Sequence, residues 1–153
     1  MIVWLDARVV LALHDRQLAE HGGSPGVRDA HLLESALGRP QQLYAYGDPP
    51  PDLTELAASL AFGLARKKPF VDGNRRTAYV AYRTFLALNG AEMTASDEQK
   101  YLAILALAEG KLTEREFAAW LRAHIATPPR HRVQEPRAPT AKRKPVARRR
   151  KDA

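Results

Sequence analysis

Residues 68–82 read Lys-Pro-Phe-Val-Asp-Gly-Asn-Arg-Arg-Thr-Ala-Tyr-Val-Ala-Tyr, a polar turn that leads directly into an apolar helical run. The turn holds one carboxylate, one glycine and two adjacent guanidinium groups, supplied by Asp72, Gly73, Arg75 and Arg76. Unpaired N–H groups at the start of a helix attract anions, and a glycine lets the backbone approach a ligand closely. We therefore expect the functional chemistry of this chain in a loop between two helices.

The sequence on both sides of the loop indicates further helices joined by short connections, so we expect an all-α fold. Two residue pairs have the spacing of a capping box, in which each side chain bonds the other residue's backbone N–H: Asp52 with Glu55, and Thr113 with Glu116. Strand signals are weak, and consist of residues 1–4 and a short hairpin around 42–47. The expected helices cover about 6–20, 29–37, 52–66, 76–88, 96–108 and 113–125.

Charge divides the chain into two parts. Residues 130–153 hold ten Lys and Arg residues and two acids, whereas residues 1–129 hold fourteen basic and fifteen acidic groups. The net charge of +7 therefore belongs to the C-terminal segment, and the body is not a basic nucleic-acid-binding domain. We expect one domain over 1–127. The Pro-, Arg- and Lys-rich segment 128–153 is expected to be disordered, and either to contact nucleic acid without sequence preference or to have no binding role.

The chain contains no cysteine, which excludes a disulfide framework and a thiolate zinc site. An acid, Asp6, follows the N-terminus before an apolar signal-peptide core could form. No stretch approaches the roughly 18 uncharged apolar residues that span a bilayer. We expect a cytoplasmic protein without membrane contact.

The loop residues have side chains that suit a polyphosphate and its metal ion. Arg75 and Arg76 can fork onto phosphoryl oxygens, and Asp72 offers the carboxylate that Mg²⁺ prefers beside water and phosphate. Phe70 is expected to point inward and restrain the loop. The alternative is an ordinary glycine turn, in which Asp72 or Asn74 caps the helix and both arginines face solvent.

Residues 69–77, Pro-Phe-Val-Asp-Gly-Asn-Arg-Arg-Thr, resemble the signature of the Fic/Doc family, H-P-F-x-D/E-G/A-N-K/G-R. Stretches outside the loop are similar to the Doc, or death-on-curing, toxin branch of that family: 14–16, 22–29, 33–37 and 85–90. The resemblance covers roughly residues 3–125. It implies a compact Fic-fold helical bundle that uses ATP and Mg²⁺, because family members move part of a nucleoside triphosphate onto a protein hydroxyl.

The resemblance also implies roles for individual residues. Asp72 is expected to bind Mg²⁺, while Gly73, Asn74, Arg75 and Arg76 hold the nucleotide phosphates. Phe70 is expected to be structural.

Two further expectations concern specificity and target docking. AMP-transferring members carry a second arginine three positions after Arg76, where this chain has Tyr79, as Doc-like members do. Tyr44 and Tyr46 lie in a region that resembles the flap on which family members dock their target.

The Doc branch is associated with γ-phosphate transfer to translation elongation factor Tu, and with a Phd-type antitoxin that neutralises the toxin. By resemblance, this chain is expected to be the toxin of a toxin–antitoxin pair, with elongation factor Tu as its target. The expected catalytic residues are Lys68, Asp72 and Arg76.

Lys68 departs from the family pattern, which has a histidine as general base at this position. Imidazole suits that task because its pKa lies near neutrality, whereas a lysine side chain, with an ordinary pKa of about 10.4, keeps its proton. Three interpretations follow: a natural variant with altered or lost catalysis, a deliberately disabled toxin, or a lysine that binds phosphate or acts as a nucleophile. The alternative functions are a non-catalytic nucleotide- or antitoxin-binding module and an AMP-transferring Fic-type enzyme.

Overall fold

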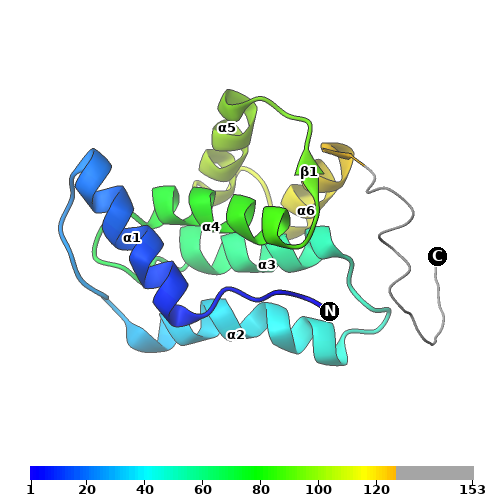
Figure 1. Cartoon of the computed structure of the whole chain (residues 1–153), viewed down its shortest axis with the longest axis horizontal. Helices are drawn as coiled ribbons and strands as arrows, with labels where there is room; N and C mark the ends of the chain where they lie inside the picture. Colours follow the sequence, from blue (N-terminus) through cyan, green and yellow to red (C-terminus); the bar gives the residue numbers. More distant parts are fainter. Residues whose placement is uncertain (127–153) are drawn as a thin grey trace.

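The computed structural model describes residues 1–126, which form six helices and one small antiparallel sheet (Figure 1). The predicted all-α class is confirmed for this part of the chain, and the predicted segment 128–153 lies outside the described residues. The elements are α1 (Ala7–His21), α2 (Ala30–Tyr46), α3 (Leu53–Ala65), α4 (Asn74–Leu88), β1 (Glu92–Met93), α5 (Asp97–Ala108), α6 (Glu114–Ala123) and β2 (Ile125–Ala126).

Local capping explains where most helices begin. Five of the six helices in the described part of the chain start with a side chain that accepts a hydrogen bond from a first-turn N–H: Asp6, Asp29, Asp52, Ser96 and Thr113. Both predicted capping boxes are present. Helix α4 differs, because it begins after Gly73 without any side-chain cap. Its first N–H groups are therefore available to a ligand.

Helix α3 is the central element of the core. It packs against α2, α4 and α6, and most of its residues are buried (Figure 1). Gly63 makes the contact with α2 close, since a Cβ at this position would lie 2.7 Å from the Cβ of Ala36. On α4, burial raises the pKa of Tyr82, whose hydroxyl donates to the carbonyl of Lys100 at 3.0 Å. The core thus fixes the orientation of α3 and α4, the two helices that the functional loop connects.

Helix α2 is longer than predicted, and the expected hairpin around 42–47 is wrong. Pro40 lacks an N–H and crowds the carbonyl four residues earlier, so a helix end was expected there. In the structure Pro40 is buried on the same face as Leu33 and Ala36, and the helix continues to Tyr46. Burial of this apolar face outweighs the single missing hydrogen bond.

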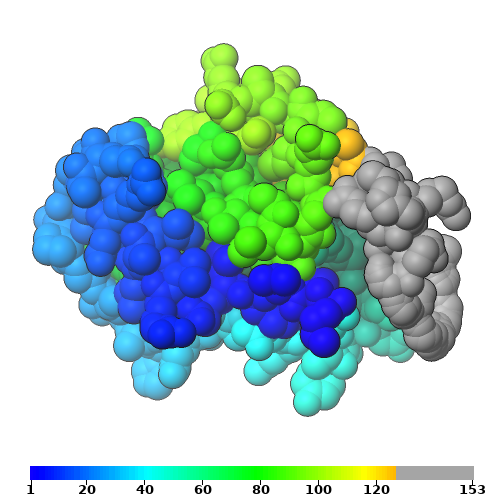
Figure 2. Space-filling model, in the orientation of Figure 1, coloured from blue at the N-terminus to red at the C-terminus, as the bar shows by residue number. Residues whose placement is uncertain are grey.

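The two strands of the structure lie outside the two segments in which strands were expected. β1 pairs with β2, with Glu92 opposite Ala126 and Met93 opposite Ile125. Residues 1–4 form no strand, but the side-chain amide of Asn89 accepts from the N–H of Val3 at 2.8 Å and donates to its carbonyl at 2.9 Å. These two hydrogen bonds hold the N-terminal segment between α2 and the C-terminal end of α4 (Figure 2).

Helices α3 and α6 are joined at the surface by one ion pair. The Nε of Arg122 donates to Asp52 at 2.9 Å. Burial alone would raise the pKa of Asp52, but hydrogen bonds from Arg122, Thr54 and the Glu55 N–H outweigh it and lower this pKa below its usual value. No helix among residues 1–126 is both long enough and apolar enough to cross a membrane.

Candidate functional site

The loop between α3 and α4 is built around Phe70. This ring is fully buried and stacks on the imidazole of His14, with ring centroids 3.8 Å apart and planes 8° from parallel. The Nε2 of His14 lies 2.8 Å from the carbonyl oxygen of Asp72. Because a carbonyl only accepts hydrogen bonds, His14 carries a proton on Nε2. A buried residue of α1 therefore supports the loop from beneath.

Asn74 closes the loop on itself. Its Oδ1 accepts from the N–H of Phe70 at 2.9 Å, and its Nδ2 donates to the carbonyl of Phe70 at 3.0 Å. Both the oxygen and the nitrogen of the Asn74 amide therefore form hydrogen bonds with the backbone of Phe70. Gly73 has φ +75°, a left-handed conformation that glycine adopts without strain, and this bend places Asn74 at the start of α4.

A second segment, residues 22–29, runs beside the loop and clamps it. The N–H groups of Arg28 and Asp29 both donate to the carbonyl of Pro69, and the N–H of Val71 donates to that of Gly26. The Arg28 guanidinium also donates to backbone, to the Lys67 carbonyl at 2.9 Å and from Nε to the Lys68 carbonyl at 2.8 Å. The segment that lies along the functional loop is therefore 22–29.

Tyr44 and Tyr46, expected on a docking flap, lie on the last turn of α2 instead. Tyr46 is 84% exposed, and Tyr44 packs edge-on against Trp4. Neither residue lines the cavity at the loop. The hairpin predicted around 42–47 is absent because α2 continues through Pro40 to Tyr46.

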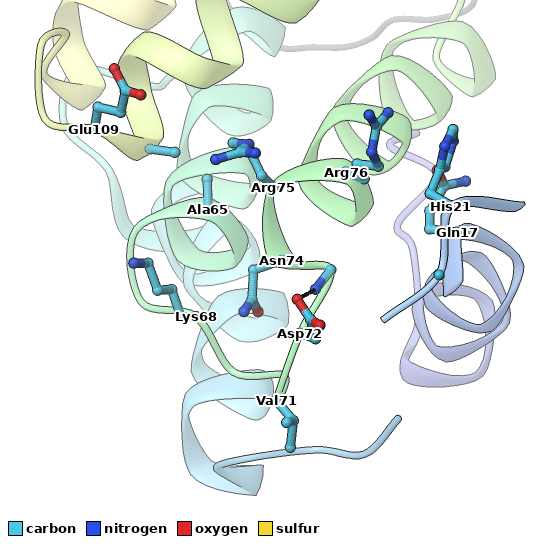
Figure 3. A pocket seen from close by; sticks show the side chains of 13 residues that line it. Gln17, His21, Ala65, Lys68, Val71, Asp72, Asn74, Arg75, Arg76 and Glu109 are labelled. Carbon is cyan, nitrogen blue, oxygen red and sulfur yellow. Dashed lines mark hydrogen bonds between the residues drawn. The ribbon is translucent and has the colours of Figure 1, made fainter. Parts of the chain in front are cut away.

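A cavity of about 520 Å³ opens over the loop and the N-terminus of α4. Figure 3 shows Lys68 and Asp72 on the loop, Arg75 and Arg76 on the first turn of α4, and side chains of α1 on the side away from Lys68. The residues that line the cavity are Gln17, His21, Gly22, Ala65, Lys68, Val71, Asp72, Gly73, Asn74, Arg75, Arg76, Ala108 and Glu109.

The structure thus brings together the predicted site residues Lys68, Asp72, Gly73 and Asn74 with the Arg75/Arg76 pair. Sequence reasoning missed Gln17 and His21 of α1, which lie one helical turn apart and form the opposite wall. Their i, i+4 spacing puts them on one face, but nothing in the sequence says that this face meets the loop.

The basic residues of the cavity form no ion pair within the described part of the chain, although Asp72 and Glu109 also line it. Within the described part of the chain, neither Lys68 nor the Arg75/Arg76 pair lies within 4.0 Å of a carboxylate. Tyr101 of α5 orients the two arginines: its hydroxyl lies 3.3 Å from Nε of Arg75, and its ring centroid lies 5.4 Å from the guanidinium carbon of Arg76. The arrangement suits an anion with several negative charges.

Asp72 is exposed, and its carboxylate is held by backbone. Oδ1 accepts from the N–H of Gly73 at 3.0 Å, and Oδ2 accepts from the N–H of Ser24 at 3.1 Å. Each oxygen keeps a further lone pair. No group of three or more His, Asp or Glu side chains among residues 1–126 could hold a metal ion by itself. The donor set fits a cation that takes one carboxylate and completes its shell with water and phosphate, as Mg²⁺ does.

Comparison with known proteins agrees with this architecture. The model of the Fic/DOC family matches residues 4–86, more than half of the chain, and the chain belongs to this family. The match includes α1 to α3, the loop and most of α4.

Two proteins named Doc are similar to this chain. It is 46% identical to "Toxin Doc" of Mycolicibacterium smegmatis over 74 residues, which are 48% of this chain and 57% of that protein. It is 35% identical to "Protein kinase doc" of Escherichia phage P1 over 113 residues, which are 74% of this chain and 88% of that protein. The first alignment spans little more than half the length of that relative.

Proposed function

We propose that this protein is a Doc-like toxin whose cavity binds Mg-ATP and directs its γ-phosphoryl group to a hydroxyl of elongation factor Tu. The observation that carries the proposal is the cavity wall shared by Lys68, Asp72, Arg75 and Arg76. The similarity to a protein kinase and to a toxin, both named Doc, supports the same activity and the same biological role. A Phd-like antitoxin is the corresponding neutralising partner, and the cytoplasm is the corresponding place of action.

The phosphates bind at the α4 side of the cavity. The uncapped N–H groups after Gly73 and the guanidinium groups of Arg75 and Arg76 hold the phosphoryl oxygens, and Arg76 stabilises negative charge that develops during transfer. Asn74 contributes by fixing the loop through Phe70, which keeps Gly73 in its left-handed conformation.

Asp72 is the residue that would hold Mg²⁺, and the ion, when bound, would neutralise phosphate charge and orient the triphosphate. The N–H groups of Gly73 and Ser24 fix the direction of this carboxylate before any ligand arrives. Such a preset ligand requires no side-chain ordering at the moment of binding.

Lys68 stands where the family pattern has its general base. Transfer forms a bond between the target hydroxyl oxygen and the γ-phosphorus, breaks the bond to the β–γ bridging oxygen, and requires a group that takes the hydroxyl proton. A protonated lysine holds phosphate but accepts no proton. We therefore propose that this sequence transfers phosphoryl groups poorly.

Tyr79 argues against AMP transfer. At the position where AMP-transferring members have a second arginine, the Tyr79 ring packs on Tyr101 and Arg83, and its hydroxyl donates to the Asp97 carbonyl at 3.3 Å. No guanidinium group is supplied from this position for an α-phosphate.

The substitution Lys68→His tests the base assignment. With γ-labelled ATP and purified elongation factor Tu, we expect label transfer to rise at least about 100-fold over the unsubstituted protein, the usual contribution of a general base. Lys68→Gln, which removes the charge without adding a base, is the control and is expected to stay inactive. Equal and detectable transfer by all three proteins would rule out a base role at position 68, and no label from any of the three would contradict transfer to this target.

Lys68 also favours a second candidate, a nucleotide-binding module without turnover. Calorimetry tests the nucleotide binding that both candidates require, and label transfer by the histidine variant separates them. Both candidates predict that the unsubstituted protein binds Mg-ATP and that Arg76→Ala weakens binding at least about tenfold, because one charged hydrogen-bonding group is lost. A Lys68→His variant that binds Mg-ATP without transferring label would favour the module.

A further inference from the structure

The basic side chains of the described part of the chain separate into two groups. Seven form ion pairs with carboxylates: Arg8, Arg16, Arg39, Arg83, Lys100, Lys111 and Arg122. Seven have no carboxylate within 4.0 Å among residues 1–126: Arg28, Arg66, Lys67, Lys68, Arg75, Arg76 and Arg115. All of the second group except Arg115 lie in the functional loop, on the first turn of α4, or on the segment that clamps the loop.

The cations at the loop divide again by position. Lys68, Arg75 and Arg76 line the cavity, where the triphosphate of the proposed function, partly neutralised by a metal ion, would be their partner. Arg28, Arg66 and Lys67 do not line it, although all three are exposed. We refer to these three residues as the outer cationic surface. No carboxylate among residues 1–126 lies within 4.0 Å of them, and they lie outside the lining of the cavity.

Contacts hold the outer cationic surface in place. The guanidinium carbon of Arg66 lies 5.4 Å and the ammonium nitrogen of Lys67 lies 5.6 Å from the centre of the Phe62 ring. Arg28 is fixed by its hydrogen bonds to the carbonyls of Lys67 and Lys68. Because these side chains are already restrained by the protein, less rotamer entropy is lost when an anionic partner binds them.

We propose that the outer cationic surface docks an acidic segment of a partner protein beside the mouth of the cavity. The guanidinium fork of Arg66 matches a carboxylate in geometry, and the positive charge of all three residues attracts an opposite charge over the screening distance of about 8 Å at physiological salt. Single-stranded nucleic acid fits less well, because it needs aromatic faces for base stacking. Phe62, the ring at this surface, is occupied by Arg39, Arg66 and Lys67.

A binding experiment with the full chain tests the proposal. The probe is a fluorescein-labelled peptide of six Glu and six Ala residues in alternation, titrated at low salt, and its Gln/Ala analogue is the neutral reference. We expect Arg66→Gln/Lys67→Gln to weaken binding roughly five- to tenfold, as for the loss of two exposed ion pairs. The control, Arg8→Gln/Arg16→Gln, removes the same charge from residues that are already paired with carboxylates, and is expected to change binding less than twofold.

A second measurement locates the peptide on the chain. A carbodiimide joins carboxylates to amines in direct contact, so mass spectrometry of the cross-linked full chain reports which lysines the peptide touches. We expect cross-links at Lys67 and none above background at Lys100 or Lys111. Cross-links confined to Lys142, Lys144 and Lys151 would overturn the proposal, because they would assign binding to the C-terminal segment.

Three further outcomes of the titration would also overturn it: no binding to the unsubstituted protein, equal weakening by the two double variants, or tighter binding of a twelve-nucleotide RNA that is lost in Arg66→Gln/Lys67→Gln. None of these depends on Mg-ATP. Failure here leaves nucleotide binding in the cavity untouched, and failure of nucleotide binding leaves this surface untouched.

Discussion

Lys68 combines an unusual backbone with a central place in the site. Its φ of +55° makes it the one non-glycine residue with a positive φ among residues 1–126. Such conformations persist only where the surroundings impose them. Here the imposing contacts are the Arg28 guanidinium on the Lys68 carbonyl and the two N–H groups that hold the next carbonyl, that of Pro69. The same contacts that strain the backbone direct the Lys68 side chain to the cavity.

This strain predicts different effects of glycine at two adjacent positions. Lys67→Gly is expected to lower the free energy of unfolding by about 1–2 kcal/mol, because glycine gains backbone freedom in the unfolded chain and the ammonium contact with the Phe62 ring is lost. At position 68 glycine also removes a left-handed penalty of roughly 1 kcal/mol, so Lys68→Gly is expected to be close to neutral. Urea denaturation of both variants measures the difference. A Lys68→Gly variant as destabilised as Lys67→Gly would mean that the left-handed conformation stores no strain.

Most of the residues of the site could be predicted from the sequence because they are consecutive. Lys68, Asp72, Gly73 and Asn74 all lie within residues 68–74, so a local sequence pattern is enough to assign them to one site. The α1 wall could not be predicted, since Gln17 and His21 reach the cavity only through the packing of α1 on α4. The same holds for the role of His14 beneath Phe70, which depends on a contact between residues 56 positions apart.

Among the helices, features set by neighbouring residues could be predicted from the sequence, whereas features set by contacts between distant residues could not. Caps and capping boxes involve residues three positions apart, so every helix start marked by such a residue was predictable. The continuation of α2 through Pro40 was not, because it depends on burial against α3. The β1–β2 pair joins segments more than 30 residues apart and is too short to leave a periodic signal.

The contact between α2 and α3 predicts opposite effects for two helical glycines. A Cβ added at Gly63 would lie 2.8 Å from the Cα of Ala36, whereas one added at Gly38 has nothing within 4 Å. Gly63→Ala is expected to lower the free energy of unfolding by about 1–3 kcal/mol through overpacking. Gly38→Ala is expected to raise it by about 0.5–1 kcal/mol, since alanine favours a helix. Thermal or denaturant unfolding measures both, and equal effects would disprove a tight α2–α3 contact.

On the scale of the whole molecule, positive charge occurs in two places with different surroundings. Residues 1–129 are close to electrically neutral overall, yet six of the seven basic residues that have no carboxylate within 4.0 Å among residues 1–126 lie in or beside one loop. The segment 130–153 contains ten basic residues, two acids and no Phe, Trp or Tyr. The first group is positioned by a folded scaffold and suits defined anions, whereas the second has the composition of a segment that binds polyanions through charge alone.

Deleting residues 128–153 is therefore expected to abolish salt-sensitive binding to single-stranded RNA while preserving Mg-ATP binding in the cavity. Binding through charge releases counterions, so affinity for the full chain should fall steeply with salt, by about 0.7 of a logarithmic unit per phosphate contact for each tenfold increase. The matched control keeps the length of the chain and changes the ten basic residues of 130–153 to Gln. This variant is expected to lose RNA binding as the deletion does, because charge rather than chain length attracts the phosphates. RNA binding that survives neutralisation of this segment would instead assign nucleic-acid contact to the unpaired cations of the folded body.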